Sequence, residues 1–242
     1  MTRPSVPRRR AAAAFLAARL DRTSYLGLHL TLGLLAIVAA LWAFGALLGE
    51  ILENEGLARW DQATSLAIHD AMTPALTAAA QLVTNVGSPV GMGVLAAVAV
   101  VLLWRRHRLL AQTWIAAAAG GGVVDLVLKG AVRRARPPYG AGYLHHDSFS
   151  FPSGHAMAAT IGFGMLAYVA HSLRPGRATA AAAYLVAALL TLLVCATRIY
   201  LGVHYPSDVA GGVFGGVAWL AVCQTGAGVA RGRAATRATP TA

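Results

Sequence analysis

The chain has 242 residues, of which 57% are hydrophobic and 12% are charged, about half the charged fraction of an ordinary soluble domain. This composition argues against a soluble globular protein and favours a membrane protein. Twenty Lys and Arg against nine Asp and Glu give a net charge of +11, but so apolar a chain offers no polar face for nucleic acid. The two cysteines, Cys195 and Cys223, lie in apolar runs and predict neither a disulfide framework nor a metal cluster.

Six segments satisfy or nearly satisfy the requirement for crossing a membrane, which takes about 20 predominantly apolar residues. Segment 71–104 is counted once although it is long, because Gly87-Ser88-Pro89 is expected to kink it rather than to end it. The sequence therefore predicts an all-α polytopic membrane protein. Its six predicted transmembrane helices are 23–49, 71–104, 109–128, 148–173, 178–197 and 209–230.

The segment between the first two spans, 50–70, is polar and carries several acidic residues. It predicts an amphipathic helix lying at the outer membrane interface as a lid or brace. The expected organisation is a basic tail at 1–22, a membrane domain at 23–230 and a disordered tail at 231–242.

The distribution of basic residues predicts the orientation. The two tails and the turns at 105–108 and 174–177 hold fourteen basic residues and one acid, a net +13, and the rest of the chain carries −2. The positive-inside rule then places both termini in the cytoplasm of a multi-pass cell-membrane protein. The same rule taken alone would place the run Arg133-Arg134-Ala135-Arg136 in the cytoplasm, against this orientation. That placement would leave the other basic turns outside the cell, so the orientation is kept.

Three polar clusters lie where predicted spans end on the outer face. The first is Lys129-x6-Arg136-Pro137, in which a helical cation is followed by a guanidinium where Pro137 and Pro138 stop the helix. Two fixed positive charges suit a phosphate. The alternative is an interfacial anchor, in which long side chains extend to the lipid headgroups.

The second cluster is Pro152-Ser153-Gly154-His155, which opens directly into an apolar run. Residues of this kind ahead of a helix leave free backbone N–H groups at its positive dipole end, so they predict an anion site beside His155. The alternative is that Ser153 is a plain N-cap and His155 an interfacial histidine.

The third cluster is Arg198-x5-His204-x3-Asp208, in which Pro206 and Ser207 are expected to start the last helix. Asp208 can then reach back to one ring nitrogen of His204, which fixes the tautomer and leaves the other nitrogen free to attack. The alternative is a capping carboxylate bonded to a nearby histidine.

Together, Lys-x6-Arg-Pro, Pro-Ser-Gly-His and Ser-Arg-x5-His-x3-Asp resemble, in type and order, the signature of the type-2 phosphatidic acid phosphatases. That superfamily also includes soluble acid phosphatases and vanadium haloperoxidases. The resemblance covers about residues 70–225. Thr197 stands where the family usually has Ser, and because the hydroxyl is kept we expect altered packing rather than lost activity.

The resemblance implies a role for each matching position. Lys129, Arg136 and Arg198 would hold the phosphoryl oxygens, with the Ser153 hydroxyl and the Gly154 amide completing the cradle. His204 would be the nucleophile, Asp208 its orienting carboxylate and His155 the general acid. Neither metal nor cofactor is expected. Arg133 and Arg134 are expected to act only electrostatically, and Asp125 is left unassigned.

The predicted function is therefore hydrolysis of a lipid phosphomonoester or diphosphate through a phosphohistidine, on the extracytoplasmic face. Phosphatidic acid, phosphatidylglycerol phosphate, undecaprenyl diphosphate and sphingolipid phosphates all fit as substrates, and the oligomeric state stays open. The partners are the bilayer and its lipids, without nucleic acid. The alternatives are a transporter or channel, since Asp125 and Lys129 lie at membrane depth, a non-catalytic relative, and a haloperoxidase, which the apolar composition disfavours.

Overall fold

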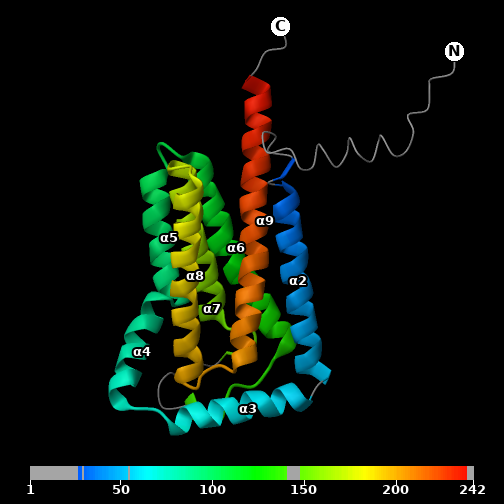
Figure 1. The fold of residues 1–242 in the computed structure, drawn as a ribbon, viewed down its shortest axis with the longest axis vertical. Coiled ribbons are helices and arrows are strands. Elements are labelled where there is room, and N and C mark those ends of the chain that lie inside the picture. Colours follow the sequence, from blue (N-terminus) through cyan, green and yellow to red (C-terminus); the bar gives the residue numbers. More distant parts are fainter. Residues whose placement is uncertain (1–26, 29, 54, 141–147, 239–242) are drawn as a thin grey trace, which may run out of the picture.

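The computed structural model describes residues 27–28, 30–53, 55–140 and 148–238, and these residues form helices and no strand. Most of the helices stand side by side in a bundle, while α3 crosses one end of it (Figure 1). This confirms the predicted all-α class. The helices are α2 (Leu30–Glu53), α3 (Glu55–Asp70), α4 (Pro74–Val86), α5 (Pro89–Leu103), α6 (Arg108–Val132), α7 (Gly154–Leu173), α8 (Arg177–Tyr200) and α9 (Pro206–Ala238), with a short 3-10 helix, η2 (Pro138–Gly140).

Five of these helices, α2 and α6 to α9, are long and apolar enough to cross a membrane. Helices α4 and α5 meet the same criteria only as a pair, bent by 40°, and counting this pair as one broken span brings the number to six. The bend lies at the predicted kink, where the Ser88 side chain accepts a hydrogen bond from the Gly91 amide (2.9 Å) and Pro89 begins α5. The described helices therefore agree with the prediction of six spans.

Several predicted boundaries differ in the structure, and three of them have a clear local cause or consequence. The first four residues of segment 50–70 belong to α2, so the crossing helix α3 begins only at Glu55. The fourth span begins at Gly154 rather than at 148, because Ser153 caps α7. The tail 231–242 was expected to be disordered, but α9 continues to Ala238 because this stretch is rich in Ala and Arg, which are strong helix formers. The tail predicted at 1–22 lies outside the described residues.

Helix α7 forms the centre of the bundle and packs against α5, α6, α8 and α9. Eleven of its residues are buried, against a single buried residue in α2. Small residues let α9 approach it closely: a Cβ added at Gly212 would lie 2.5 Å from the Ser153 carbonyl oxygen. This contact places the start of α9 directly against the start of α7.

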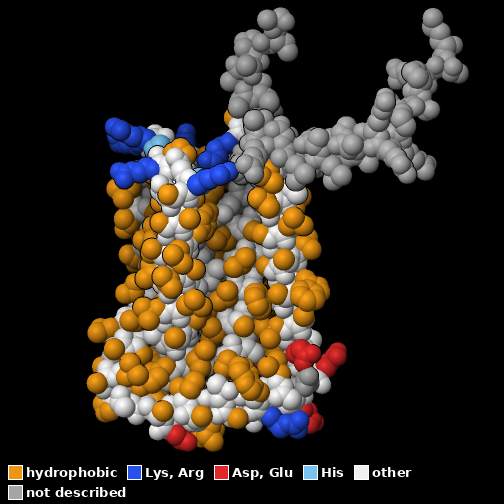
Figure 2. Space-filling model, viewed as in Figure 1, with side chains coloured by type: hydrophobic (Ala, Val, Ile, Leu, Met, Phe, Trp, Pro, Cys, Tyr) orange, Lys and Arg blue, Asp and Glu red, His pale blue; other side chains and the backbone are white. Residues whose placement is uncertain are grey.

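The surface shows the pattern of a membrane protein. Apolar side chains cover the flank of the bundle, and Lys and Arg side chains gather at the end opposite α3 (Figure 2). Many large apolar residues that point outward are more than half exposed, including Trp42, Leu82 and Leu102. A hydrocarbon environment removes the cost of such exposure. The chain is a multi-pass membrane protein.

Candidate active site

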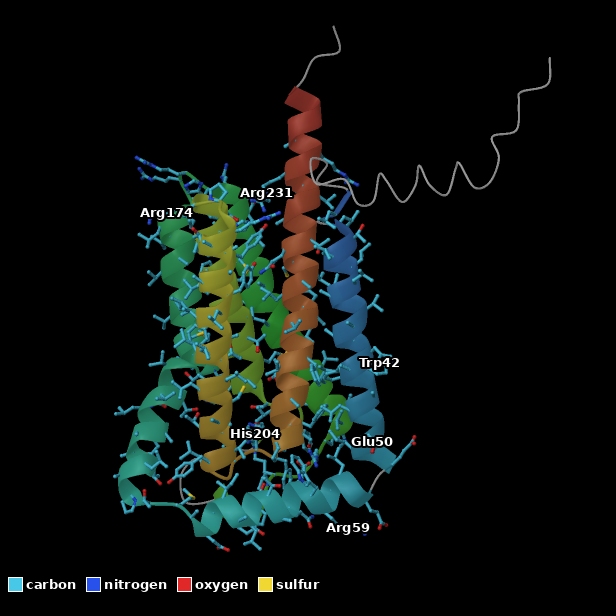
Figure 3. The ribbon with its side chains drawn as sticks, viewed as in Figure 1. Trp42, Glu50, Arg59, Arg174, His204 and Arg231 are labelled. Carbon is cyan, nitrogen blue, oxygen red and sulfur yellow. The ribbon has the colours of Figure 1, made fainter. Side chains whose placement is uncertain are left out.

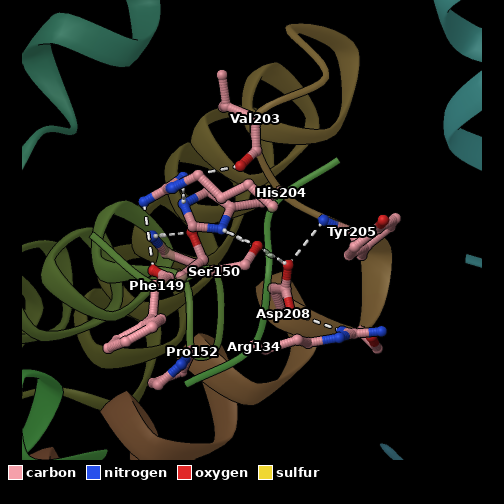
Figure 4. A network of polar contacts seen from close by, with 12 residues as sticks. Arg134, Phe149, Ser150, Pro152, Val203, His204, Tyr205 and Asp208 are labelled. Carbon is pink, nitrogen blue, oxygen red and sulfur yellow. Dashed lines mark hydrogen bonds and ion pairs between the residues drawn. The ribbon is translucent and has the colours of Figure 1, made fainter. Parts of the chain in front are cut away.

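The three clusters meet at the end of the bundle that α3 crosses. Figure 3 shows His204 between the lower ends of α8 and α9, above α3. The first cluster comes from the end of α6 and the loop after it, the second from the start of α7, and the third from the end of α8 and the start of α9. Residues that are far apart in the chain therefore share one polar site, seen from close by in Figure 4.

His204 is held in a tight turn between α8 and α9. Gly202 has a φ of +65°, a conformation that favours glycine, and Pro206 begins α9. Asp208, in the first turn of α9, lies with Oδ2 3.7 Å from Nδ1 of His204. The Ser150 hydroxyl donates to the same Oδ2 (2.5 Å) and lies 3.4 Å from Nδ1, so it bridges the two side chains (Figure 4).

The other ring nitrogen of His204 faces the cations of the site. Nε2 lies 3.2 Å from Nη1 of Arg136, which also donates to the Val203 carbonyl oxygen (2.8 Å). Because a guanidinium only donates, Nε2 is the acceptor and the ring proton lies on Nδ1, toward Asp208. His204 is thus in the tautomer that keeps a lone pair available on Nε2.

Burial and charge keep His204 neutral. Burial lowers its pKa from 6.5 to about 3, and the positive charges of Arg136 and Arg198 act in the same direction against the opposing effect of Asp208. Burial also lowers the pKa of Arg136. At neutral pH the ring is uncharged and lies beside positive charge, an arrangement that would suit attack on a phosphoryl group.

Arg198 is fully buried at the end of α8. Nη1 donates to the Thr84 hydroxyl (3.0 Å), while Nε and Nη2 are buried without a hydrogen-bond partner among the described residues. Unpaired buried donors of a charged group are costly unless a ligand fills them. Two adjacent N–H donors of a guanidinium match two oxygens of a phosphate. The buried Nε and Nη2 donors of Arg198 therefore have a geometry that suits an oxyanion.

Lys129 links the first cluster to the second. It is 8% exposed, and its Nζ donates to Oδ1 of Asp125 (2.8 Å) and to the Pro152 carbonyl oxygen (2.5 Å). Asp125, which the sequence left unassigned, is therefore the ion-pair partner of Lys129 one helical turn away. The pair lies beside Gly154, where an added Cβ would be 3.0 Å from Asp125 Oδ2.

Ser153 and His155 begin α7 as predicted. The Ser153 hydroxyl accepts from the Ala156 amide (3.5 Å), so it caps the helix and keeps its own proton free to be donated. The Ser153 amide donates to the Asp208 carbonyl oxygen (2.9 Å), which fixes this loop to α9. His155 is the second residue of α7 and is half-buried.

The structure also brings in residues that the sequence did not single out. Asp61 of α3 is fully buried and bonded to Arg134, which also contacts Asp208. Ser150 and Ser207 join the same network. The two serines could have been found from the sequence, because each is a polar residue in or beside one of the motifs. Asp61 could not, because it lies 146 positions before Ser207 and no motif surrounds it.

Two further expectations concern Thr197 and metal. The Thr197 hydroxyl is buried and donates to the Val194 carbonyl oxygen of its own helix (2.6 Å), so it is used within α8. Within the part of the chain that the structure describes, no group of three or more His, Cys, Asp or Glu could hold a metal ion.

Comparison with known proteins agrees with the motifs. The PAP2 superfamily profile matches residues 108–228. Phosphatidylglycerophosphatase B of Bacillus subtilis is 38% identical over 91 residues, which span 37% of this chain and only 44% of that relative. Decaprenylphosphoryl-5-phosphoribose phosphatase of Mycobacterium tuberculosis is 34% identical over 185 residues, which span 72% of this chain and 96% of the relative.

A solved structure shares the fold. The crystal structure described as the first transmembrane PAP2-type phosphatidylglycerolphosphate phosphatase, from Bacillus subtilis, aligns with a TM-score of 0.69 and 26% identity. The alignment covers 77% of this chain and 93% of that one. Motifs, profile and fold agree, so the chain belongs to the PAP2 superfamily and is, like these relatives, a phosphatase.

Proposed function

We propose that this protein hydrolyses a phosphate ester or diphosphate of a membrane lipid, with His204 as nucleophile and Lys129, Arg136 and Arg198 as the phosphate cradle. The Ser153 hydroxyl and the Gly154 amide complete the cradle. The roles follow the motif positions, and the membrane domain 23–230 carries all of them.

One observation carries the proposal: two arginines of the site have no carboxylate partner among the described residues. Lys129 pairs with Asp125, and Arg134 pairs with Asp61 and Asp208. Arg136 and Arg198 form no ion pair with any described acid. A phosphate dianion would supply the missing negative charge, close to Nε2 of His204.

The chemistry follows from this placement. His204 Nε2 attacks phosphorus, the P–O bond to the lipid breaks, and His155 gives its proton to the departing oxygen. Water then loses a proton to His155 and attacks phosphorus, the P–N bond breaks, and inorganic phosphate leaves. Asp208 stabilises the positive ring through Nδ1 during the first step. Positioned cations offset the charge on the equatorial oxygens throughout.

Phosphate release from a lipid panel tests the function. The panel contains phosphatidic acid, phosphatidylglycerol phosphate, undecaprenyl diphosphate and decaprenylphosphoryl-5-phosphoribose, because the named relatives act on two of these lipid classes. We expect release from at least one, and release that is slower by about 10² to 10³-fold from an Arg198→Ala variant that folds normally. Release by both proteins at equal rates would contradict the proposal.

We also propose that the site faces the extracytoplasmic side. The exposed arginines at the opposite end of the bundle, which include Arg105, Arg106 and Arg174, mark that end as cytoplasmic by the positive-inside rule. Single cysteines at Arg59 and Arg174, in a background without Cys195 and Cys223, test this in intact cells. Arg59→Cys should react with an impermeant reagent and Arg174→Cys should not; the reverse pattern would contradict the orientation.

A further inference from the structure

Asp61 and Arg134 form the most buried ion pair of the described residues that the mechanism above does not use. Asp61 is 0% exposed, and its Oδ2 lies 2.7 Å from Nη2 of Arg134. The other terminal nitrogen of Arg134, Nη1, donates to Oδ1 of Asp208 (2.6 Å) and to the Ser207 hydroxyl (2.7 Å). One guanidinium therefore joins an acid of α3 to the carboxylate that faces the nucleophile.

This bridge leaves Asp208 no freedom to turn. Oδ1 is held by Arg134, and Oδ2 accepts from the Ser150 hydroxyl (2.5 Å) and the Tyr205 amide (2.8 Å). A carboxylate held on both oxygens presents Oδ2 to His204 in a single orientation. Without Arg134, Oδ1 would lose its charged partner and the group would be free to rotate about its own axis.

Arg134 is in turn held by its surroundings. Its guanidinium lies 4.6 Å from the centre of the Tyr205 ring. Burial by itself lowers its pKa, but Asp208 and Asp61 outweigh this and raise the pKa. Asp61 also accepts from the amide and the hydroxyl of Ser207. These contacts attach α3 to the first turn of α9.

We propose that Asp61 and Arg134 are positioning residues for phosphoryl transfer, which fix Asp208 and through it His204, so that α3 is part of the catalytic apparatus. The inference rests on the proposed role of His204. Both terminal nitrogens of Arg134 are bonded to carboxylates, to Asp61 through Nη2 and to Asp208 through Nη1, so neither Asp61 nor Arg134 is assigned to the phosphate cradle. Their loss should therefore lower kcat and leave KM unchanged.

Arg134→Gln and Asp61→Asn, compared with Arg133→Gln, test the proposal in the purified full-length protein. Arg133 is the matched control, because it is exposed and the hydrogen bond found for its side chain among the described residues is from Nε to the Gly130 carbonyl oxygen within its own turn. We expect kcat to fall by about 10²-fold for the first two, with KM within about twofold of the wild type, because misplacement of a reacting group by about 1 Å costs that much. Arg133→Gln should leave both constants unchanged.

A double-mutant cycle separates positioning from mere attachment of α3. In an Asp208→Asn background, Arg134→Gln should cost no further rate, because the group it positions is already altered. The rate of each of these slow variants is measured as single-turnover release of p-nitrophenol from p-nitrophenyl phosphate, with enzyme in excess. Equal costs of Arg134→Gln in both backgrounds, or a change in thermal unfolding with normal kcat, would overturn the proposal.

A milder variant covers the case in which Arg134→Gln does not fold. Ser207→Ala removes only the hydroxyl that Asp61 and Arg134 share. It should lower kcat several-fold without changing KM, and an unchanged kcat would overturn the proposal. If the proposed function is wrong, the result is different. The His204→Ala variant would then still hydrolyse substrate, while the double-mutant cycle would still measure the coupling between Arg134 and Asp208.

Discussion

The two ends of the bundle use the same basic residue types in opposite ways. At the end away from α3, Arg105, Arg106 and Arg174 are exposed. At the α3 end, Arg198 is 0% exposed and Lys129 is 8% exposed. Exposed charges remain hydrated, so they destabilise the folded protein little. Their effect is on how the chain is oriented in the membrane. A buried charge is costly unless an opposite charge or a bound ligand pairs with it, so buried cations indicate a binding site.

The sharpest test of this contrast is at the two histidines of the site. His204→Ala should abolish turnover, because it removes the ring nitrogen Nε2, whose lone pair lies beside Arg136 and is proposed to attack phosphorus. His155→Ala should still be phosphorylated by an ester with a good leaving group, whose departure needs little protonation, and the acid-labile adduct should accumulate.

Rapid-quench trapping with a radiolabelled phosphate ester, followed by peptide mapping, measures both outcomes. The label should map to the peptide that contains His204. Label on Ser153 or His155 of the wild type would show that the nucleophile is assigned wrongly, although membership of the superfamily would stand.

The next largest effect is expected from the cations. Arg136→Ala, Arg198→Ala and Lys129→Ala should each lower turnover by about 10² to 10³-fold, the usual cost of removing one preorganised charge donor. Arg174→Ala, at the exposed end, should leave turnover within about twofold, as surface substitutions usually do. Equal effects at both ends, measured as phosphate release, would remove the distinction between site and surface charges.

Acidification should destabilise the site end through His204. Its pKa is about 3 in the folded protein against 6.5 ordinarily, so between these values the unfolded chain binds more protons. The free energy of unfolding therefore falls as the pH is lowered through this window, by up to about 1.4 kcal/mol per pH unit. Thermal unfolding in detergent between about pH 7 and about pH 4.5 should show a shallower slope for His204→Gln. An unchanged slope would contradict this.

The smallest effect is expected from removing divalent metal. Because the proposed cradle uses side-chain cations, turnover in EDTA should equal turnover without it, while vanadate should inhibit as a mimic of the five-coordinate transition state. Phosphate release measures both. Loss of turnover in EDTA that Mg²⁺ restores would point to a different mechanism.

Most of the fold was accessible from local sequence. Apolar length predicted the spans, because a helix must satisfy its own backbone hydrogen bonds to cross a membrane. The kink at Gly87-Ser88-Pro89, the helix that opens after Pro152-Ser153 and the start of the last helix at Pro206 were equally local, and the structure shows all three. The end of α9 was wrong because the helix propensity of the basic tail was underrated.

The candidate site also contains both residues that local sequence indicated and residues that only the structure revealed. Lys129, Arg136, His204 and Asp208 were found from spacing, since each motif occupies one turn or one helix end. The sequence alone thus determined the family, the spans and the motif residues. Tertiary structure alone decided that Asp61 of α3 reaches Arg134, and that Arg198 is left with unpaired donors. The reason is physical: pairing of buried charges depends on which helices pack together, and segments that meet only after folding carry no shared local signal.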